Sequence, residues 1–213
     1  MRETAILIPF KANHRKSRLS KVLNLYQRRR LAELMLMDVL HAFHKARLLP
    51  NCHVVSSDGQ VLALVRRLGG QTIAETKDNG VNSAVNAGVR ELGEGQDFMV
   101  VPADLPLLSK DEIVNALALK TSLGCVISPS HSFDGTNMLI FPGETPPALS
   151  YDSDSFWNHI RWAAESRLSL AVYCGKGVLS DIDTPEDLRL LSRVGRRIPS
   201  VEFAQGAVKK RES

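Results

Sequence analysis

The chain has 213 residues, 44% of them hydrophobic, which is enough to bury one sizeable core in a single domain. No apolar run reaches the length of a membrane span, and the three widely spaced cysteines give neither a disulfide framework nor a zinc-binding pattern. The net charge of +4 is mild. Because Pro9 and Lys11 interrupt the first apolar run, no signal peptide is expected, and we predict a soluble cytoplasmic protein.

Short apolar runs alternate with helical patterns along the chain. Strands are expected near residues 5–8, 53–56, 72–74, 98–101, 125–127, 138–141 and 170–173. Helices are expected near 28–47, 60–68, 82–92, 109–121 and 154–166, and a last one opens at Thr184-Pro185. This alternation predicts a single α/β domain over residues 1–213, with a doubly wound, mainly parallel sheet. The polar tail from about Ile198 is expected to be peripheral, and disordered unless it packs on the body or on a partner.

Asp104 stands between two prolines just after the predicted strand at 98–101. In open α/β sheets, ligands bind in the crevice at the carboxyl ends of the strands. Pro102 and Pro106 stiffen this loop, so the direction of the Asp104 side chain is restricted. Asp104 is therefore a candidate site residue, the alternative being that it only braces its own turn.

The segment after the first strand is strongly basic. It holds eight Lys and Arg residues and no acid, namely Lys11, Arg15, Lys16, Arg18, Lys21, Arg28, Arg29 and Arg30. Such a block indicates an anionic partner, either a phosphorylated small molecule or a nucleic acid. The first loop of this topology commonly handles phosphates, so Lys11, Lys16 and Arg18 are candidates to neutralise a triphosphate. No GxGxxG or Walker motif is present, which disfavours hydride transfer and P-loop chemistry. The alternative is an ordinary solvated basic loop.

Asp181 and Asp183 form a second acidic candidate in the stretch LSDIDTPEDL. If Ser180–Asp183 is extended, both carboxylates project to the same face, because the strand period is two. Two carboxylates side by side favour a cation between them, and oxygen ligands suit Mg²⁺ or Mn²⁺. The alternative, that one aspartate caps the following helix, accounts for only one of them.

Small polar residues mark a third region. Thr136 begins a predicted strand, and Ser155 precedes a helix whose N-terminal amides would attract an anion. His159 on that helix is expected to be structural. Asp78 and Asn82 could read a nucleobase edge, although they also suit an ordinary helix start.

Taken in order, seven stretches resemble the 2-phospho-L-lactate guanylyltransferases of deazaflavin coenzyme biosynthesis. They are IPFK, KSRLS, DNGVNSA, VVPADLPLL, DGTNMLIF, SFWNH and LSDIDTPEDL, which are spread over residues 6–188, nearly the whole chain. The resemblance implies a nucleotide-diphosphosugar transferase fold. It also implies GTP as donor and a small phosphorylated acid as acceptor, 2-phospho-L-lactate in archaeal members and phosphoenolpyruvate in some bacterial ones.

The resemblance also implies roles for particular residues. Asp104, Asp181 and Asp183 would hold Mg²⁺ or Mn²⁺ and act in catalysis with Lys11 and Lys16. The nucleotide would be bound by Lys11, Lys16, Arg18, Asp78 and Asn82, and the acceptor by Thr136, Asp152 and Ser155. Related bacterial enzymes have glycine where this chain has Asp152, whose carboxylate would repel an anionic acceptor unless only its backbone faces the pocket or it helps to hold a metal. Phosphoenolpyruvate is therefore the less favoured acceptor.

Other functions are weighed against this one. Molybdopterin guanylyltransferases and sugar nucleotidyltransferases usually carry a glycine-rich first loop, whereas PFKANHRKSRLS contains no glycine. A metal-dependent glycosyltransferase could use an Asp-Ile-Asp motif, but it would place that motif at the end of a central strand, where this chain has PADLP. A nucleic-acid-binding module would explain the basic block but not the three aspartates. We expect no nucleic acid or membrane partner, and a homodimer as the assembly.

Overall fold

The structure is a computed structural model that describes residues 3–11, 17–120, 124–147, 151 and 154–212. Within these residues, one seven-stranded sheet has the order β3-β2-β1-β4-β6-β5-β7. The strands are β1 (Thr4–Pro9), β2 (Cys52–Ser56), β3 (Gln71–Ala74), β4 (Asp97–Val100), β5 (Gly124–Pro129), β6 (Thr136–Pro142) and β7 (Ser169–Val172). Only β6 runs antiparallel to its neighbours, so the prediction of a mainly parallel sheet is confirmed.

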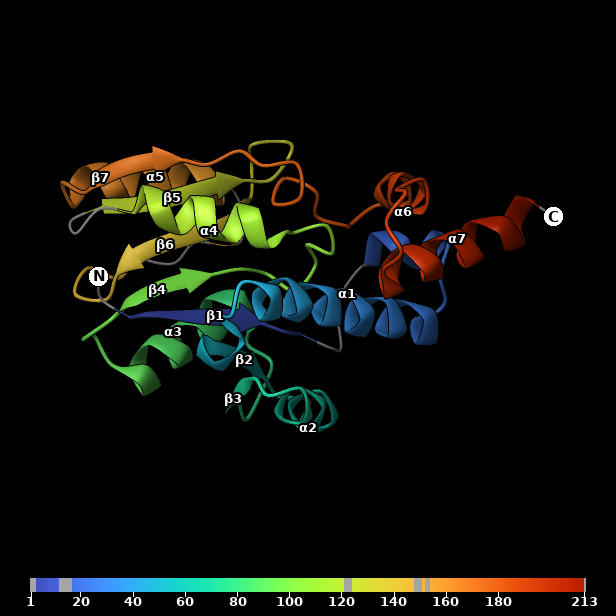
Figure 1. The fold of residues 1–213 in the computed structure, drawn as a ribbon, viewed down its shortest axis with the longest axis horizontal. Helices are drawn as coiled ribbons and strands as arrows, with labels where there is room; N and C mark the ends of the chain where they lie inside the picture. The colour runs from blue at the N-terminus through green and yellow to red at the C-terminus, as the bar shows by residue number, and fades with distance from the viewer. Residues whose placement is uncertain (1–2, 12–16, 121–123, 148–150, 152–153, 213) are drawn as a thin grey trace.

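Helices cover both faces of the sheet (Figure 1). They are α1 (Leu25–Lys45), α2 (Gly59–Arg67), α3 (Gly80–Leu92), α4 (Lys110–Leu119), α5 (Ser155–Glu165), α6 (Pro185–Ser192) and α7 (Pro199–Glu212), with short 3-10 turns at Ser17–Lys21 and Leu49–Asn51. Alternate residues of β1 face opposite layers: Ile6 packs with α1, α2 and α4, and Leu7 packs with α3 and α5. No helix in the described part of the chain is long and apolar enough to cross a membrane.

A third apolar cluster lies beyond the carboxyl edge of the sheet, where the start of α1 meets α6 and α7 (Figure 1). Val201 and Ala204 of α7 are fully buried in it. Ile182, the middle residue of Asp181-Ile182-Asp183 (the DID segment), is buried there too. The Asp38 carboxylate on α1 accepts a 3.2 Å hydrogen bond from the Ser200 backbone N–H, one of the free donors in the first turn of α7. The tail is therefore a docked helix, contrary to the disorder that its polar composition suggests.

One local expectation changes in the structure. Ser180–Asp183 is not a strand, although it keeps the alternation expected of one, because Ile182 is buried while Asp181 and Asp183 stay partly exposed. The expected helix starts agree better. Ser109 and Glu112 form the capping box of α4, and Thr184 caps α6 with Pro185 in its first turn.

Candidate active site

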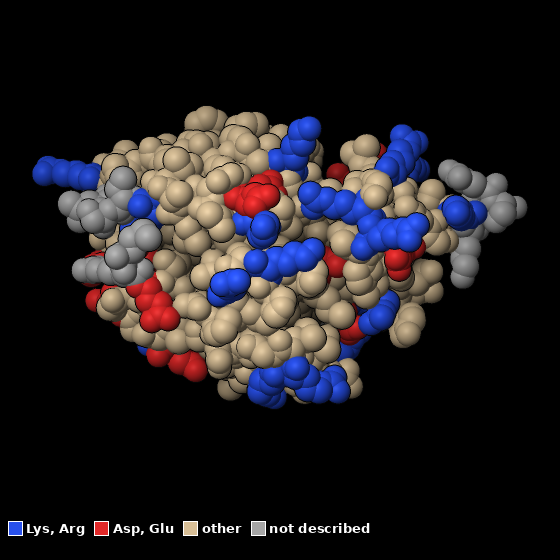
Figure 2. Space-filling view, in the orientation of Figure 1, with Lys and Arg blue, Asp and Glu red and all other residues tan. Residues whose placement is uncertain are grey.

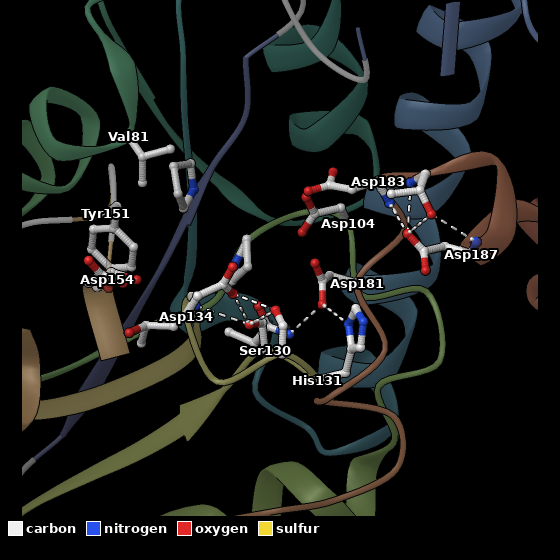
Figure 3. Close-up of a pocket in the computed structure, with 18 of the residues that line it drawn as sticks. Val81, Asp104, Ser130, His131, Asp134, Tyr151, Asp154, Asp181, Asp183 and Asp187 are labelled. Atoms are coloured by element: carbon white, nitrogen blue, oxygen red, sulfur yellow. Dashed lines mark hydrogen bonds and ion pairs between the residues drawn. The ribbon is translucent and has the colours of Figure 1, made fainter. Parts of the chain in front are cut away.

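A pocket of about 600 Å³ opens at the carboxyl edge of the sheet, a size typical of small-molecule sites (Figure 3). Pro9 and Val100 line it from the ends of β1 and β4, and the β5–β6 loop closes one side. Among the described residues, six aspartates line it, which are Asp104, Asp134, Asp154, Asp181, Asp183 and Asp187. The pocket is therefore strongly acidic.

The main chain joins Asp104 to the DID segment. The Ile182 backbone N–H donates a 3.2 Å hydrogen bond to the Asp104 carbonyl oxygen, although the two residues lie far apart in the sequence. Figure 3 shows the side chains of Asp104, Asp181 and Asp183 at the same end of the pocket. The loop after β4 and the segment before α6 thus meet as the sequence predicts.

Neither Asp181 nor Asp183 serves as the cap of the following helix. Thr184 is the N-cap of α6, and its side chain accepts from the Asp187 N–H. The Asp187 carboxylate in turn accepts from the backbone N–H groups of Asp183 and Thr184, at 3.0 and 2.7 Å. Asp187 therefore fixes the turn that carries Asp183.

Asp181 lies in unfavourable electrostatic surroundings. Burial raises the pKa of its carboxyl group, and the neighbouring Asp104 and Asp183 charges raise the pKa further. Asn137 opposes this by donating a 3.0 Å hydrogen bond to Asp181 Oδ1, while the same amide holds the Val178 carbonyl oxygen at 2.9 Å. A cation or a cationic ligand here would relieve the repulsion.

The carboxylates of Asp104, Asp181 and Asp183 are suitable ligands for Mg²⁺, but they are not arranged as a complete metal site. Among the described residues, no three acidic, histidine or cysteine side chains come together closely enough to hold a metal ion. Mg²⁺, however, is commonly bound through one or two carboxylates, waters and substrate phosphates. Asp104, Asp181 and Asp183 supply such oxygens from one end of the pocket, so the magnesium site stays a prediction that the donor set supports.

Thr136 and Ser155, the predicted acceptor ligands, both line the pocket. Thr136 begins β6, and Ser155 begins α5, whose amino end favours an anion, although the Phe156 N–H of its first turn already donates to the Asp134 carbonyl oxygen at 3.4 Å. The Thr136 hydroxyl lies 2.9 Å from His159 Nδ1, on the buried side of the same helix. Asp152, the third predicted ligand, lies outside the described residues.

The predicted nucleotide residues are only partly brought together. Arg18 lines the pocket, whereas Lys16 lies outside the described residues. Lys11 is buried, and its ammonium group contacts the carboxylates of Glu75 and Asp78, the latter at 3.3 Å. Lys11 and Asp78 therefore meet, but neither is among the described residues that line the pocket. Their contact with a nucleotide stays a prediction.

Part of the basic block serves the fold. Arg29 pairs with Glu33 on its own helix and with Asp58, the N-cap of α2. Figure 2 shows Lys and Arg side chains in several separate groups on the face that carries α1, with acidic side chains between some of them. The cations of the block thus do not all face one anionic partner.

Comparison with known proteins shows the family of this chain. The family model described as "Guanylyl transferase CofC like" matches residues 4–206. The chain belongs to this guanylyltransferase family. It is 34% identical over 176 residues to a 2-phospho-L-lactate guanylyltransferase of Methanocaldococcus infernus, covering 83% of this chain and 78% of that protein. A second relative of the same name, from Methanothermobacter thermautotrophicus, is 33% identical over 191 residues, which are 88% of this chain and 83% of the relative.

Solved structures agree on the fold of this guanylyltransferase. A provisionally named nucleotide-diphospho-sugar transferase from Desulfovibrio desulfuricans G20 superposes with a TM-score of 0.75 at 18% identity, over 99% of this chain and 98% of its own. A nucleotidyl transferase from Methanothermobacter thermautotrophicus gives 0.64 at 13% identity, over 97% and 98%. The predicted fold of the nucleotide-diphosphosugar transferase type is confirmed.

Sequence reasoning missed several residues that shape the pocket of this guanylyltransferase. Asn137 and Asp187 were not among the candidates: the partners of Asn137 lie in a loop distant in sequence, whereas Asp187 bonds the turn just before its own helix. The spacing of Ser109 and Glu112 predicts a capping box, but the Glu112 carboxylate also accepts from the backbone N–H groups of Gly177 and Val178, at 2.7 and 3.2 Å. This bond holds the loop that leads to Asp181. The only available signal was the spacing of the capping box itself.

Proposed function

We propose that the protein transfers the guanylyl group of GTP to 2-phospho-L-lactate, giving lactyl-2-diphospho-5'-guanosine and pyrophosphate, in deazaflavin coenzyme biosynthesis. The observation that carries the proposal is the family match over residues 4–206, with relatives of that name at 30–34% identity. The backbone hydrogen bond that joins Asp104 to the DID segment supports it, because nucleotidyl transfer needs the charge of the reacting phosphates to be stabilised at one place in the pocket.

The reaction is an in-line displacement. A phosphate oxygen of the acceptor attacks the α-phosphorus of GTP, the bond from that phosphorus to the β-phosphate oxygen breaks, and pyrophosphate leaves with the bonding electrons. The acceptor phosphate is largely a dianion at neutral pH, so it needs no general base. The protein's main contributions are therefore positioning and charge neutralisation.

Each end of the pocket has its own task. Thr136 and the amino end of α5 at Ser155 would hold the acceptor through neutral donors. Arg18 would grip phosphate oxygens of GTP, and Lys11 with Asp78 would contact the nucleotide beyond the described pocket. Asp104, Asp181 and Asp183 would hold Mg²⁺ or Mn²⁺. When bound, the metal would offset the repulsion between these carboxylates and the phosphates of GTP.

A pyrophosphate-release screen tests the proposal. GTP, ATP, CTP and UTP are each combined with 2-phospho-L-lactate or phosphoenolpyruvate, with Mg²⁺ and after chelation by EDTA. We expect turnover with GTP and 2-phospho-L-lactate, and loss of turnover on chelation. Equal turnover with ATP would contradict the choice of donor, and faster turnover with phosphoenolpyruvate would contradict the choice of acceptor.

Variants locate the chemistry within the same assay. Asp183→Asn should lower turnover by about a hundredfold or more, because it removes one proposed metal-binding charge. Glu165→Gln changes an exposed carboxylate at the far end of α5 and is the matched control.

The homodimer and the cytoplasmic location belong to this proposal as expectations. Light scattering on the purified protein measures whether it is a dimer.

A further inference from the structure

A buried hydrogen bond lies directly behind the proposed acceptor site. Thr136 Oγ1 and His159 Nδ1 are 2.9 Å apart, and His159 is 0% exposed. Thr136 lines the pocket, whereas His159 is not among the described residues that do so. Among the described residues, the hydrogen bond to the Thr136 hydroxyl is the polar link by which His159 can act on a bound acceptor.

The direction of this hydrogen bond decides what Thr136 offers to a ligand. A hydroxyl group has one proton to donate and two lone pairs. If Thr136 donates to a bare Nδ1, its only proton is used and just lone pairs remain for the pocket. If His159 Nδ1–H donates to Thr136, the hydroxyl proton stays free for an anionic oxygen.

The surroundings of the imidazole favour the second arrangement. His159 Nε2 has no hydrogen-bond partner among the described residues, and the Tyr151 ring packs edge-on against the imidazole at 4.9 Å between centroids. A buried N–H without a partner is rarer in proteins than an under-used acceptor. The proton of the neutral ring is thus better placed on Nδ1, where it has the Thr136 oxygen.

We propose that His159 is a positioning residue that donates from Nδ1–H to Thr136 Oγ1 and so turns the Thr136 hydroxyl proton toward an anionic oxygen of the acceptor. This inference rests on the proposed function, in which Thr136 contacts the acceptor. Ser155 and His159 stand one helical turn apart on α5, so the same helix sets both contacts to the acceptor.

The imidazole acts by geometry and not by charge. Burial lowers the pKa of His159 to about 4, so the ring is neutral over the working range of pH.

Kinetics of four variants test the inference. His159→Leu removes the donor, His159→Asn keeps an N–H donor near the position of Nδ1, and Thr136→Val removes the hydroxyl. The fourth combines His159→Leu with Thr136→Val. We expect His159→Leu to raise the KM for 2-phospho-L-lactate about tenfold, the worth of one hydrogen bond, with the KM for GTP unchanged. His159→Asn should recover most of this loss, and the double variant should be no worse than Thr136→Val alone.

Additive effects in the double variant, or equal changes in both KM values, would overturn the inference and leave His159 a core residue. A wild-type protein that releases no pyrophosphate with any acceptor would instead overturn the proposed function.

A direct measurement on the wild-type protein does not depend on the activity of any variant. The chain has six histidines, so ¹⁵N-histidine labelling and a long-range ¹H–¹⁵N correlation spectrum give few signals. The His159 signal is assigned by its absence in His159→Asn, or in Thr136→Ser by its shift. We expect the Nδ1–H tautomer, and an Nε2–H tautomer would overturn the inference whether or not the enzyme is active.

Discussion

The ionised carboxylate of Asp181 destabilises the folded protein, and a role in metal binding would explain why it is there. Burial, and then the charges of Asp104 and Asp183, raise the pKa of this carboxyl group, so its ionised form is disfavoured in the folded protein. In Asp181→Asn the charge is lost, while the amide oxygen can still accept from Asn137. We predict that the variant unfolds at a higher temperature than the wild type and has turnover reduced by about a hundredfold or more.

The sign of the pH dependence follows from the raised pKa. The folded state binds this proton more tightly than the unfolded state, so the ionised Asp181 lowers stability above its folded pKa. The stability gained by Asp181→Asn should therefore be present at neutral pH and should vanish as the pH falls through the raised pKa toward 3.8. Thermal unfolding of both proteins across this range measures it. A variant less stable than the wild type at pH 7 would contradict the prediction.

At the level of elements, α4 and the loop after β7 hold each other in place. Glu112 uses one oxygen for the capping box with Ser109 and the other for the backbone of Gly177 and Val178. Gly177 fits because it has no side chain: a Cβ there would clash with the backbone carbonyl oxygen of Leu107 and with Glu112. The loop cannot retreat without breaking the Glu112 bonds and moving the chain that leads to Asp181.

Gly177→Ala should therefore be damaging although it adds only a methyl group. We predict a loss of about 1–3 kcal/mol in the free energy of unfolding, measured by urea titration, together with reduced turnover. Gly195→Ala is the matched control, since a Cβ at that glycine meets nothing within 4 Å. Equal stability of the two variants would show that the loop adjusts freely.

The elements themselves were largely predictable, because strands and amphipathic helices leave local patterns. The runs at β1, β2 and β4, the capping box at Ser109 and the helix start at Thr184-Pro185 were placed from sequence. The second role of Glu112 and the bond from Asn137 to Asp181 were not, because both depend on where a distant loop packs. Asp104 and Asp181 could be paired in advance, because the resemblance to the 2-phospho-L-lactate guanylyltransferases implies one metal site for both.

The tail shows what composition alone cannot decide. The segment from Ile198 is polar on average, which is typical of disorder, yet α7 buries Val201 and Ala204 beside α1 and α6. Two small apolar residues three positions apart are enough to form one buried stripe on a helix. Whether such a stripe packs depends on an apolar surface elsewhere, here the side chains of Leu31 and Met35 on α1.

Over the whole molecule, the third apolar cluster, formed by α1, α6, α7 and Ile182, links the C-terminal helix to the candidate active site. Ile182 is buried in it, and the residues on either side of Ile182 are the aspartates of the pocket. A looser cluster should let the DID segment shift against Asp104, to which it is joined by the 3.2 Å backbone hydrogen bond. Misplacement of catalytic groups by about 1 Å can cost on the order of a hundredfold in rate.

Val201→Ala tests this link, because it opens a small cavity far along the chain from the aspartates. We predict a loss of about 1–3 kcal/mol in the free energy of unfolding and a several-fold lower turnover at temperatures well below unfolding. Gln205→Ala on the exposed side of the same helix is the control and should stay within about 0.5 kcal/mol of the wild type. If Val201→Ala lowers stability but leaves turnover unchanged, α7 supports the fold without helping to place Asp181 and Asp183.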